Sequence, residues 1–301
     1  MIALDAVLAA AEGEVAPAIS AAVWVGGVER YARGAERVYD LASLTKPLCT
    51  AEVAMCALDA GALDLDRGHP LLPKGVTIAH LLQHSAGFPA WRALWDEGDR
   101  AAVIRAALAT PRPTAPGVAH AYSDLGFLAL GAVLEEVGGA RIDELWEGPL
   151  RWGDPKAEPT YCDERGAVVT GTVHDRNAAA MGGRAPHAGL FGSAREVAAC
   201  ADRWLKGDVP LAYTAFARRG IGTHALGWDT PNGDGTSSAG PRPPAGAVGH
   251  LGFTGTAVWM VPRRRIVAVL LTNRVMTRAG LAPVRALRQA WFQAVWDTFP
   301  E

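Results

Sequence analysis

The hydrophobic period changes twice along this chain, and those changes limit the folds that it can adopt. Apolar residues at 19–25, the Gly26-Gly27 pair and a short run to Tyr31 predict a β-hairpin near the start. Strand-like patterns return only at 257–260 and 266–272, before a last helix predicted over 282–296. Because strands stand at both ends with helices between them, we expect the two ends to pair in one sheet and the helical block to be an insertion.

The middle of the chain is predicted to be mainly helical. From Ser43 to Ala60 there is no glycine and only one proline, and apolar residues occur almost all round, as in a buried helix that ends at Gly61. Pro47 is tolerated in a first turn, so it places the helix start close to Ser43. Further helices are predicted over Thr77–His84, Arg100–Ala109, Ser123–Val137 and Arg141–Trp146. Glycine, proline and serine at 232–249 predict an exposed loop.

The composition is that of a soluble globular protein. The chain has 301 residues and a formal net charge of −2, which offers no basic band for a nucleic-acid backbone. We interpret Arg263-Arg264-Arg265 as a solvated turn between strands. No stretch reaches the roughly 20 apolar residues of a membrane-spanning helix. Residues 1–5 lack the positive region of a secretory signal, so we expect a cytoplasmic protein, or an exported one if an upstream segment is missing.

Residue spacing gives no indication of a metal site. No Cys-x-x-Cys pair is present, and we predict that the four cysteines are small buried hydrophobes: Cys49, Cys56, Cys162 and Cys200. His80 and His84 lie four residues apart on a predicted helix, but Leu81 stands where a His-Glu-x-x-His motif has glutamate. We therefore favour packing over metal binding for this histidine pair.

A candidate catalytic motif is Ser43-Leu44-Thr45-Lys46, which lies where a strand-like segment is followed by a predicted helix. The chain has seven serines and four lysines, so a chance Ser-x-x-Lys is expected roughly 0.1 times. On a helical turn this spacing brings the ammonium beside the hydroxyl. The lysine can then activate the serine as a nucleophile if burial lowers its pKa. The alternative is that Ser43 is only a helix N-cap and Lys46 a surface charge.

Two further elements carry groups that would suit the same chemistry. Tyr122-Ser123-Asp124 precedes an apolar run, and a phenol beside the lysine could relay the serine proton. The segment 250–256, which reads His-Leu-Gly-Phe-Thr-Gly-Thr, leads into a predicted strand. Its glycines would allow a close approach to substrate, and a strand edge could supply an N–H group to an oxyanion.

Together the three elements resemble, in order and spacing, the serine β-lactamase and penicillin-binding protein superfamily, in its class C β-lactamase-like and esterase branch. The resemblance covers nearly the whole chain. It extends to further segments at 78–88, Val173-His174-Asp175, His187-Ala188-Gly189-Leu190-Phe191 and Leu270-Leu271-Thr272-Asn273-Arg274.

The resemblance implies a mixed α/β fold, with helices and an antiparallel sheet (α+β). The sheet would lie between helices, and a mainly helical domain would be inserted. Residues 1–45 with 186–301 would form the first domain and 46–185 the second, with the active site between them. The nucleophile would be Ser43, with Lys46 and Tyr122 as the general acid/base pair. The N–H groups of Ser43 and Phe253 would form the oxyanion hole.

The third motif and Asp124 would contact substrate, and two of these residues depart from the true β-lactamases. Asp124 replaces an asparagine, and a carboxylate donates no hydrogen bond unless it is protonated. His250, followed by Gly252 and Phe253, replaces a lysine and attracts a substrate carboxylate less strongly at neutral pH. If Asp124 lies near Lys46, it will also favour the charged lysine, although it could instead cap its helix.

We therefore expect an acyl-transfer hydrolase that acts on esters or on peptides and amides containing D-amino acids, with weak or no β-lactam hydrolysis. The alternatives are a penicillin-binding enzyme like the D-alanyl-D-alanine carboxypeptidases, a true β-lactamase, or a catalytically silent relative that binds ligands. No metal or organic cofactor is implied, because acyl transfer through serine needs base, oxyanion donors and water. The expected partner is a small-molecule or peptide substrate, and the sequence does not indicate an oligomeric state.

Overall fold

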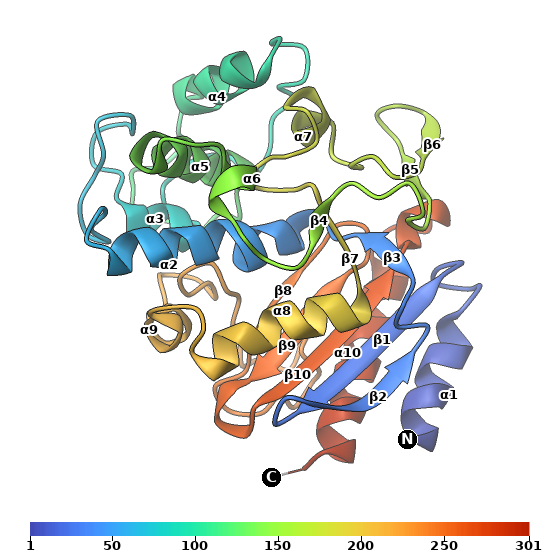
Figure 1. Cartoon of the computed structure of the whole chain (residues 1–301). Helices are drawn as coiled ribbons and strands as arrows, with labels where there is room; N and C mark the ends of the chain where they lie inside the picture. Colours follow the sequence, from blue (N-terminus) through green and yellow to red (C-terminus); the bar gives the residue numbers. More distant parts are fainter. Residues whose placement is uncertain (301) are drawn as a thin grey trace.

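The computed structural model describes residues 1–300, and its centre is a five-stranded antiparallel sheet with helices on both faces (Figure 1). The strand order is β2-β1-β10-β9-β8. The bounds are Ile19–Val25 for β1, Val28–Arg33 for β2, Val248–Leu251 for β8, Ala257–Val261 for β9 and Ile266–Thr272 for β10. Strand β1 pairs with β10 along its whole length, from Ile19 opposite Thr272 to Val25 opposite Ile266. The two ends of the chain therefore lie side by side in the middle of the sheet.

Strand β10 is a continuous apolar run because both of its faces are buried. Ile266, Ala268 and Leu270 belong to one hydrophobic cluster, which they share with residues of the two terminal helices. Val267 and Val269 alternate with them and belong to the other cluster, together with residues of the helical region. A strand directs successive side chains to opposite faces, so one segment contributes to two cores.

Three helices cover the sheet. Helix α8, Ala194–Lys206, lies across one face against β1, β9 and β10. A reciprocal capping box between Ser193 and Glu196 begins α8, and Gly207 in the left-handed region follows its end. Helices α1, Ile2–Ala11, and α10, Ala282–Thr298, pack against each other on the opposite face.

The helical region lies beside this sheet, at the top of Figure 1. Its helices are α2 (Glu52–Asp59), α3 (Ile78–Leu82), α4 (Arg100–Ala109), α5 (Asp124–Gly138), α6 (Ile142–Leu145) and α7 (Arg176–Ala180), and the short α9 (Ala212–Ala217) follows α8. A small sheet in the order β3-β7-β4 connects the two parts, with bounds Val38–Asp40, Leu190–Ser193 and Arg151–Trp152. The hairpin β5-β6 spans Thr160–Cys162 and Ala167–Val169.

The predicted fold class is confirmed: a mixed α/β structure with an antiparallel sheet between helices and a mainly helical region. Helix α4 has the predicted bounds. The helix predicted from Ser43 is divided into a 3₁₀ turn at Ala42–Leu44, a π-helix at Lys46–Ala51 and then α2. The division into domains at residues 45/46 and 185/186 stays a prediction.

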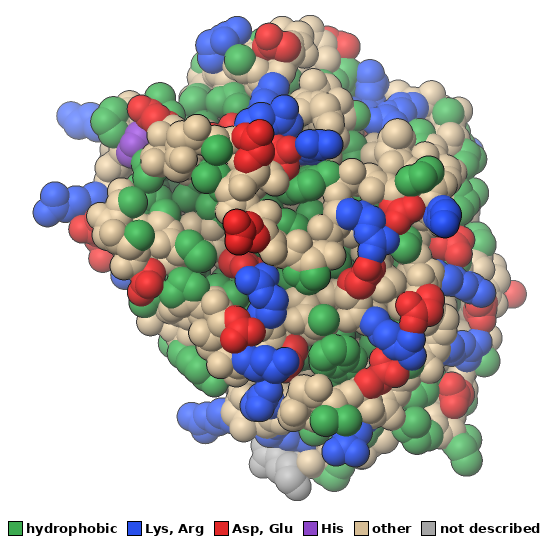
Figure 2. Space-filling model, viewed as in Figure 1, with side chains coloured by type: hydrophobic (Ala, Val, Ile, Leu, Met, Phe, Trp, Pro, Cys, Tyr) green, Lys and Arg blue, Asp and Glu red, His purple; other side chains and the backbone are tan. Residues whose placement is uncertain are grey.

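Among residues 1–300, charged side chains of one sign do not form a patch on the face of the molecule shown in Figure 2. Figure 2 shows basic and acidic side chains intermixed on the face turned toward the viewer.

Three of the four cysteines are buried as predicted, but the prediction was wrong for Cys56, which is exposed at the solvent side of α2. Among residues 1–300, no helix has both the length and the apolar character needed to cross a membrane.

Helix α5 is held against the loop before β7 by a contact that requires glycine. A Cβ on Gly131 would lie 2.0 Å from Cγ of Pro186. Alanine normally stabilises a helix interior by about 1 kcal/mol relative to glycine, but the clash outweighs that gain. We expect Gly131→Ala to lower the free energy of unfolding by about 1–3 kcal/mol in urea denaturation.

A matched control lies in the same helix. At Gly126 an added Cβ would find its nearest neighbour, the Cβ of Ser123, at 3.7 Å. Gly126→Ala should therefore leave the stability unchanged or raise it by up to about 1 kcal/mol. Equal stabilities of the two variants would contradict the importance of the contact between Gly131 and Pro186.

Candidate active site

Ser43 lies directly after β3, on a segment whose backbone is held in a strained form. Ala42 has φ of +48°, in the left-handed region that residues with a Cβ seldom adopt. The buried carboxylate of Asp40 stabilises the turn, because Oδ1 accepts the N–H of Ala42 at 2.8 Å and Oδ2 accepts the N–H of His174 at 2.6 Å. This turn presents Ser43 to the space between the sheet and the helical region.

The segment before Ser43 is also tied to the turn between β8 and β9. Oγ1 of Thr254 donates to the carbonyl of Asp40 at 2.8 Å, and Oγ1 of Thr256 donates to the carbonyl of Leu41 at 3.0 Å. Gly252 lies so close that an added Cβ would be 2.6 Å from the Leu41 carbonyl oxygen. These contacts fix the distance between the Ser43 segment and the third motif.

Phe253 occupies the corner of that turn and is positioned by Arg274. The Arg274 Nε donates to the carbonyl of Phe253 at 2.9 Å, and its guanidinium lies 4.6 Å from the centre of the Phe253 ring. Among residues 1–300, neither the Ser43 N–H nor the Phe253 N–H donates to a protein acceptor. Both N–H groups are thus available to an oxyanion.

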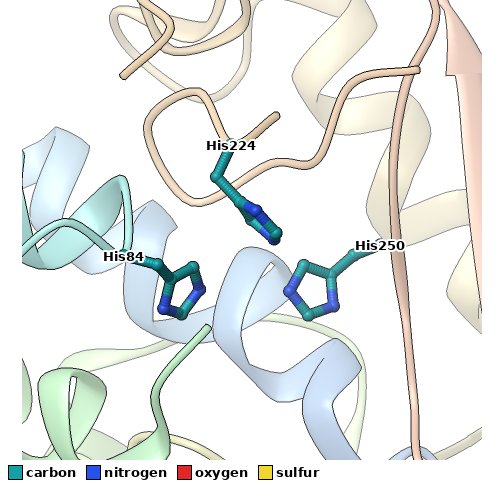
Figure 3. A group of neighbouring side chains, drawn as sticks. All are labelled: His84, His224 and His250. Atoms are coloured by element: carbon teal, nitrogen blue, oxygen red, sulfur yellow. The ribbon is translucent and has the colours of Figure 1, made fainter. Parts of the chain in front are cut away.

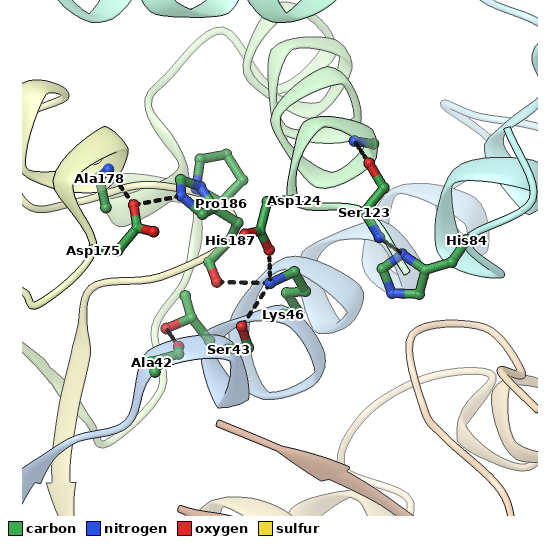
Figure 4. A network of polar contacts seen from close by, with 12 residues as sticks. Ala42, Ser43, Lys46, His84, Ser123, Asp124, Asp175, Ala178, Pro186 and His187 are labelled. Atoms are coloured by element: carbon green, nitrogen blue, oxygen red, sulfur yellow. Dashed lines mark hydrogen bonds and ion pairs between the residues drawn. The ribbon is translucent and has the colours of Figure 1, made fainter. Parts of the chain in front are cut away.

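Lys46 is fully buried and lies at the centre of the polar network in Figure 4. Its Nζ lies 2.9 Å from Ser43 Oγ, 3.2 Å from the carbonyl oxygen of His187 and 2.6 Å from Oδ1 of Asp124. An ammonium group has three N–H donors, and each has one acceptor here. The resting site therefore holds a charged lysine, which cannot by itself accept the serine proton.

The charges around Lys46 determine its protonation. Burial alone would lower the pKa of Lys46, but Asp124 and Tyr122 together raise it above its ordinary value. Burial raises the pKa of the Tyr122 phenol, although the ammonium of Lys46 acts in the opposite direction. At neutral pH the site contains a neutral phenol, an ammonium and a carboxylate.

The carbonyl that binds Lys46 belongs to a loop with its own anchor. Nε2 of His187 lies 2.9 Å from Oδ1 of Asp175, and the same carboxylate caps α7 by accepting the N–H of Ala178 at 2.7 Å. Burial acts to raise the pKa of Asp175, but His187 lowers it well below the ordinary range. The loop is thereby held in the position that its contact with Lys46 requires.

Two cavities meet at Ser43. The larger has a volume of about 700 Å³ and is lined by hydroxyl, histidine and arginine side chains from the 223–238 loop, β8 and α10. The smaller, of about 320 Å³, is lined by Trp91, Trp95 and several acidic groups of the helical region. Ser43, Tyr122 and Phe253 border both cavities. A reacting group at Ser43 could thus extend in two directions.

Buried histidines form part of the wall near Tyr122. The ring centres of His84, His224 and His250 lie 4.5, 5.7 and 5.8 Å from that of Tyr122. Burial lowers the pKa of His84 and of His250 well below the ordinary value, and it lowers the pKa of His224 to about 3, helped by His120. These rings are uncharged at neutral pH.

The structure brings all seven residues named from the sequence to one place: Ser43, Lys46, Tyr122, Asp124, His250, Gly252 and Phe253. Their roles stay a proposal. Asp124, expected at the substrate, contacts Lys46 instead of lying on the far side of its helix, which Ser123 caps. His250 lies in the wall of the larger cavity, with Nδ1 directed to the carbonyl of Leu251.

Several positioning residues could not be identified from the sequence. Asp40 and Arg274 act through backbone groups, and no spacing marks such contacts. His224 comes from a loop without a motif. Asp175 and His187 lay in segments that contributed to the resemblance, but nothing in the sequence indicated that the two side chains pair.

Comparison with known proteins gives the family. The sequence model of the β-lactamase family matches residues 4–290. A predicted D-alanyl-D-alanine carboxypeptidase of Escherichia coli (strain K12) is 28% identical over 302 residues, which covers 79% of this chain and 69% of the relative.

Two solved structures show the same fold. The class C β-lactamase of Rhodobacter sphaeroides has a TM-score of 0.73 and 19% identity, with 100% of both chains covered. EstCE1, described as a hydrolase with promiscuous acyltransferase activity, has a TM-score of 0.72 and 19% identity, with 97% of this chain and 98% of that chain covered. With the family match over nearly all of its length, the chain belongs to the β-lactamase family of serine hydrolases.

Proposed function

We propose that this protein hydrolyses esters, or peptides and amides that contain D-amino acids, through an acyl-enzyme on Ser43. The observation that carries the proposal is the 2.9 Å contact between Ser43 Oγ and the buried Nζ of Lys46, itself 2.6 Å from Asp124. A serine in this position has a route for its proton and faces two cavities of substrate size.

The serine proton leaves through Lys46 to Asp124. Because Lys46 is already protonated, its Nζ can take the proton of Ser43 only as it gives one of its own to Oδ1 of Asp124. The freed oxygen attacks the substrate carbonyl carbon, and the electron pair of the C=O bond moves to oxygen. The N–H groups of Ser43 and Phe253 stabilise that oxyanion.

Tyr122 completes the exchange of protons. The neutral phenol gives its proton to the leaving group as the bond to that group breaks, which leaves the acyl group on Ser43. Water then attacks the acyl carbon and loses its proton to the Tyr122 oxygen. Ser43 leaves with the proton that returns from Asp124 through Lys46, so the resting state is restored.

Because of the same groups, we expect weak or absent β-lactam turnover. The carboxylate of Asp124 is engaged with Lys46 and has no proton to donate to a substrate amide. The His250 ring is uncharged at neutral pH, because burial lowers its pKa, so it cannot pair with a substrate carboxylate. Both features favour neutral substrates over β-lactams.

A D-alanyl-D-alanine carboxypeptidase-like activity is the second candidate. Arg285 and Arg288 on α10 line the larger cavity. Arg288 is buried and donates to the carbonyls of Gly252 and Thr256. Arg285 is exposed, and among residues 1–300 it pairs with no carboxylate, so it is the cation available to the C-terminal carboxylate of a peptide. The E. coli relative is named for this activity.

The first prediction from this mechanism concerns substrate class. Wild type is expected to hydrolyse p-nitrophenyl esters with a burst of p-nitrophenol and to turn over nitrocefin little. Ser43→Ala should lose ester turnover, because the substitution removes the hydroxyl that would form the acyl-enzyme. A fluorophosphonate probe should label wild type and not Ser43→Ala.

The other outcomes are equally informative. Rapid nitrocefin hydrolysis would contradict the roles given to Asp124 and His250. A wild-type protein that neither labels nor turns over either substrate would contradict the acyl-enzyme and favour a ligand-binding relative.

The second prediction concerns the proton route. In Asp124→Asn, Lys46 has no acceptor for its own proton, so kcat/KM near neutral pH should fall by about 100-fold. Burial is then no longer offset by a carboxylate, which lowers the pKa of Lys46. The rate of the variant should therefore rise with pH as Lys46 deprotonates, whereas the wild-type rate stays level near neutrality.

Glu164→Gln is the matched control, because this carboxylate lines the smaller cavity without contacting Lys46. Its pH–rate profile should resemble that of wild type. An Asp124→Asn enzyme with an unchanged rate and profile would rule out Asp124 as the proton acceptor.

The third prediction separates the two candidate activities. If a peptide carboxylate binds in the larger cavity, Arg285→Ala should raise KM for D-alanine release from a peptide ending in D-alanyl-D-alanine by about 10-fold, with the KM for a neutral ester unchanged. Absence of D-alanine release by wild type, with ester hydrolysis intact, would remove the second candidate.

A further inference from the structure

Three buried histidines from distant parts of the chain converge beside the larger cavity. His84 follows α3, His224 lies in the loop after α9, and His250 lies in β8. One ring nitrogen from each lies within 4.8 Å of the other two. Figure 3 shows the three rings directed toward a common point. Convergence of imidazoles from separate segments is typical of a transition-metal site.

The outer nitrogens of two of these rings are arranged as in metal-binding histidines. Nδ1 of His250 lies 2.9 Å from the carbonyl oxygen of Leu251, which can only accept, so the proton is on Nδ1 and Nε2 presents a lone pair. In the residues described, Nε2 of His250 is buried without a protein partner. Such an outer hydrogen bond fixes the tautomer of a metal ligand.

His224 has an equivalent arrangement. Its Nδ1 lies 3.0 Å from Nε2 of His120 and 3.7 Å from Oδ1 of Asp229. A proton on Nδ1 is donated to His120, and Nε2 is then free to bind an ion. His120 thus orients His224 from behind.

His84 is held differently. Its backbone φ of +53° is in the left-handed region, a strained conformation that directs the ring to the other two. Its Nδ1 accepts the N–H of Ser123 at 3.0 Å, so the neutral ring carries its proton on Nε2. Binding an ion through Nε2 moves that proton to Nδ1 at the expense of the bond from Ser123. His84 should therefore be the weakest of the three ligands.

We propose that His84, His224 and His250 form a site for a divalent transition metal such as Zn²⁺, with a water molecule from the larger cavity as fourth ligand. Tetrahedral Zn–N bonds of about 2.1 Å require nitrogen separations of about 3.4 Å, so the rings close slightly around the ion.

Spacing in the sequence pointed only to His80 and His84. In the structure the His80 ring nitrogen Nδ1 accepts the N–H of Thr77 at the start of α3 instead.

The test is metal binding by tag-free protein in a Cys56→Ser background, which removes the exposed thiol as a competing ligand. Titration with ZnCl₂ by calorimetry should give one ion per chain, and CoCl₂ should produce the visible absorption of tetrahedral Co²⁺. His224→Gln and His250→Gln should each weaken binding by about 10- to 100-fold, and His84→Gln by less.

His80→Gln is the matched control and should bind like the parent. Circular dichroism of each variant shows whether it is folded, and the binding readout does not depend on hydrolysis at Ser43. Absence of stoichiometric binding in the parent would overturn the proposal, as would binding that His224→Gln and His250→Gln leave unchanged.

Discussion

The buried ammonium of Lys46 is the interaction on which the site depends. A charge without water is costly unless every donor is satisfied, and here the three acceptors come from the 3₁₀ turn, the loop before β7 and α5. If any one of these segments moved, a proton of Lys46 would lose its partner. The ammonium therefore holds Ser43, the helical region and the small sheet in one arrangement.

The fold could be predicted from the sequence where local patterns are strong. The alternation of two burial faces makes β10 an uninterrupted apolar run, and α4 has its predicted bounds. The π-helix at Lys46–Ala51 could not be predicted, because its altered hydrogen bonding leaves no mark on side-chain periodicity. Helix α8 was missed although its capping box, Ser193 with Glu196, is a readable signal.

The sequence identified which residues form the candidate site. It did not show which of their charged groups contact one another. The spacing of Ser43 and Lys46 and the order of Tyr122 and the third motif led to one place in the structure. Whether Asp124 faces Lys46 or caps its helix depends on how α5 packs, which the sequence left open. In the proposed mechanism, the 2.6 Å contact between Lys46 and Asp124 makes Lys46 a proton carrier instead of the base.

The pairing of β1 with β10 has a consequence for how the protein forms. The Ala18 N–H donates to Oδ1 of Asn273 across 255 residues, a very long-range contact. Contacts of this range slow folding, since a long loop must close before they contribute. During synthesis β1 cannot pair with β10 until the last strands leave the ribosome. Until that moment one edge of β1 is unpaired and must be protected from aggregation. A chain cut short before β10 cannot assemble the surroundings of Ser43 at all.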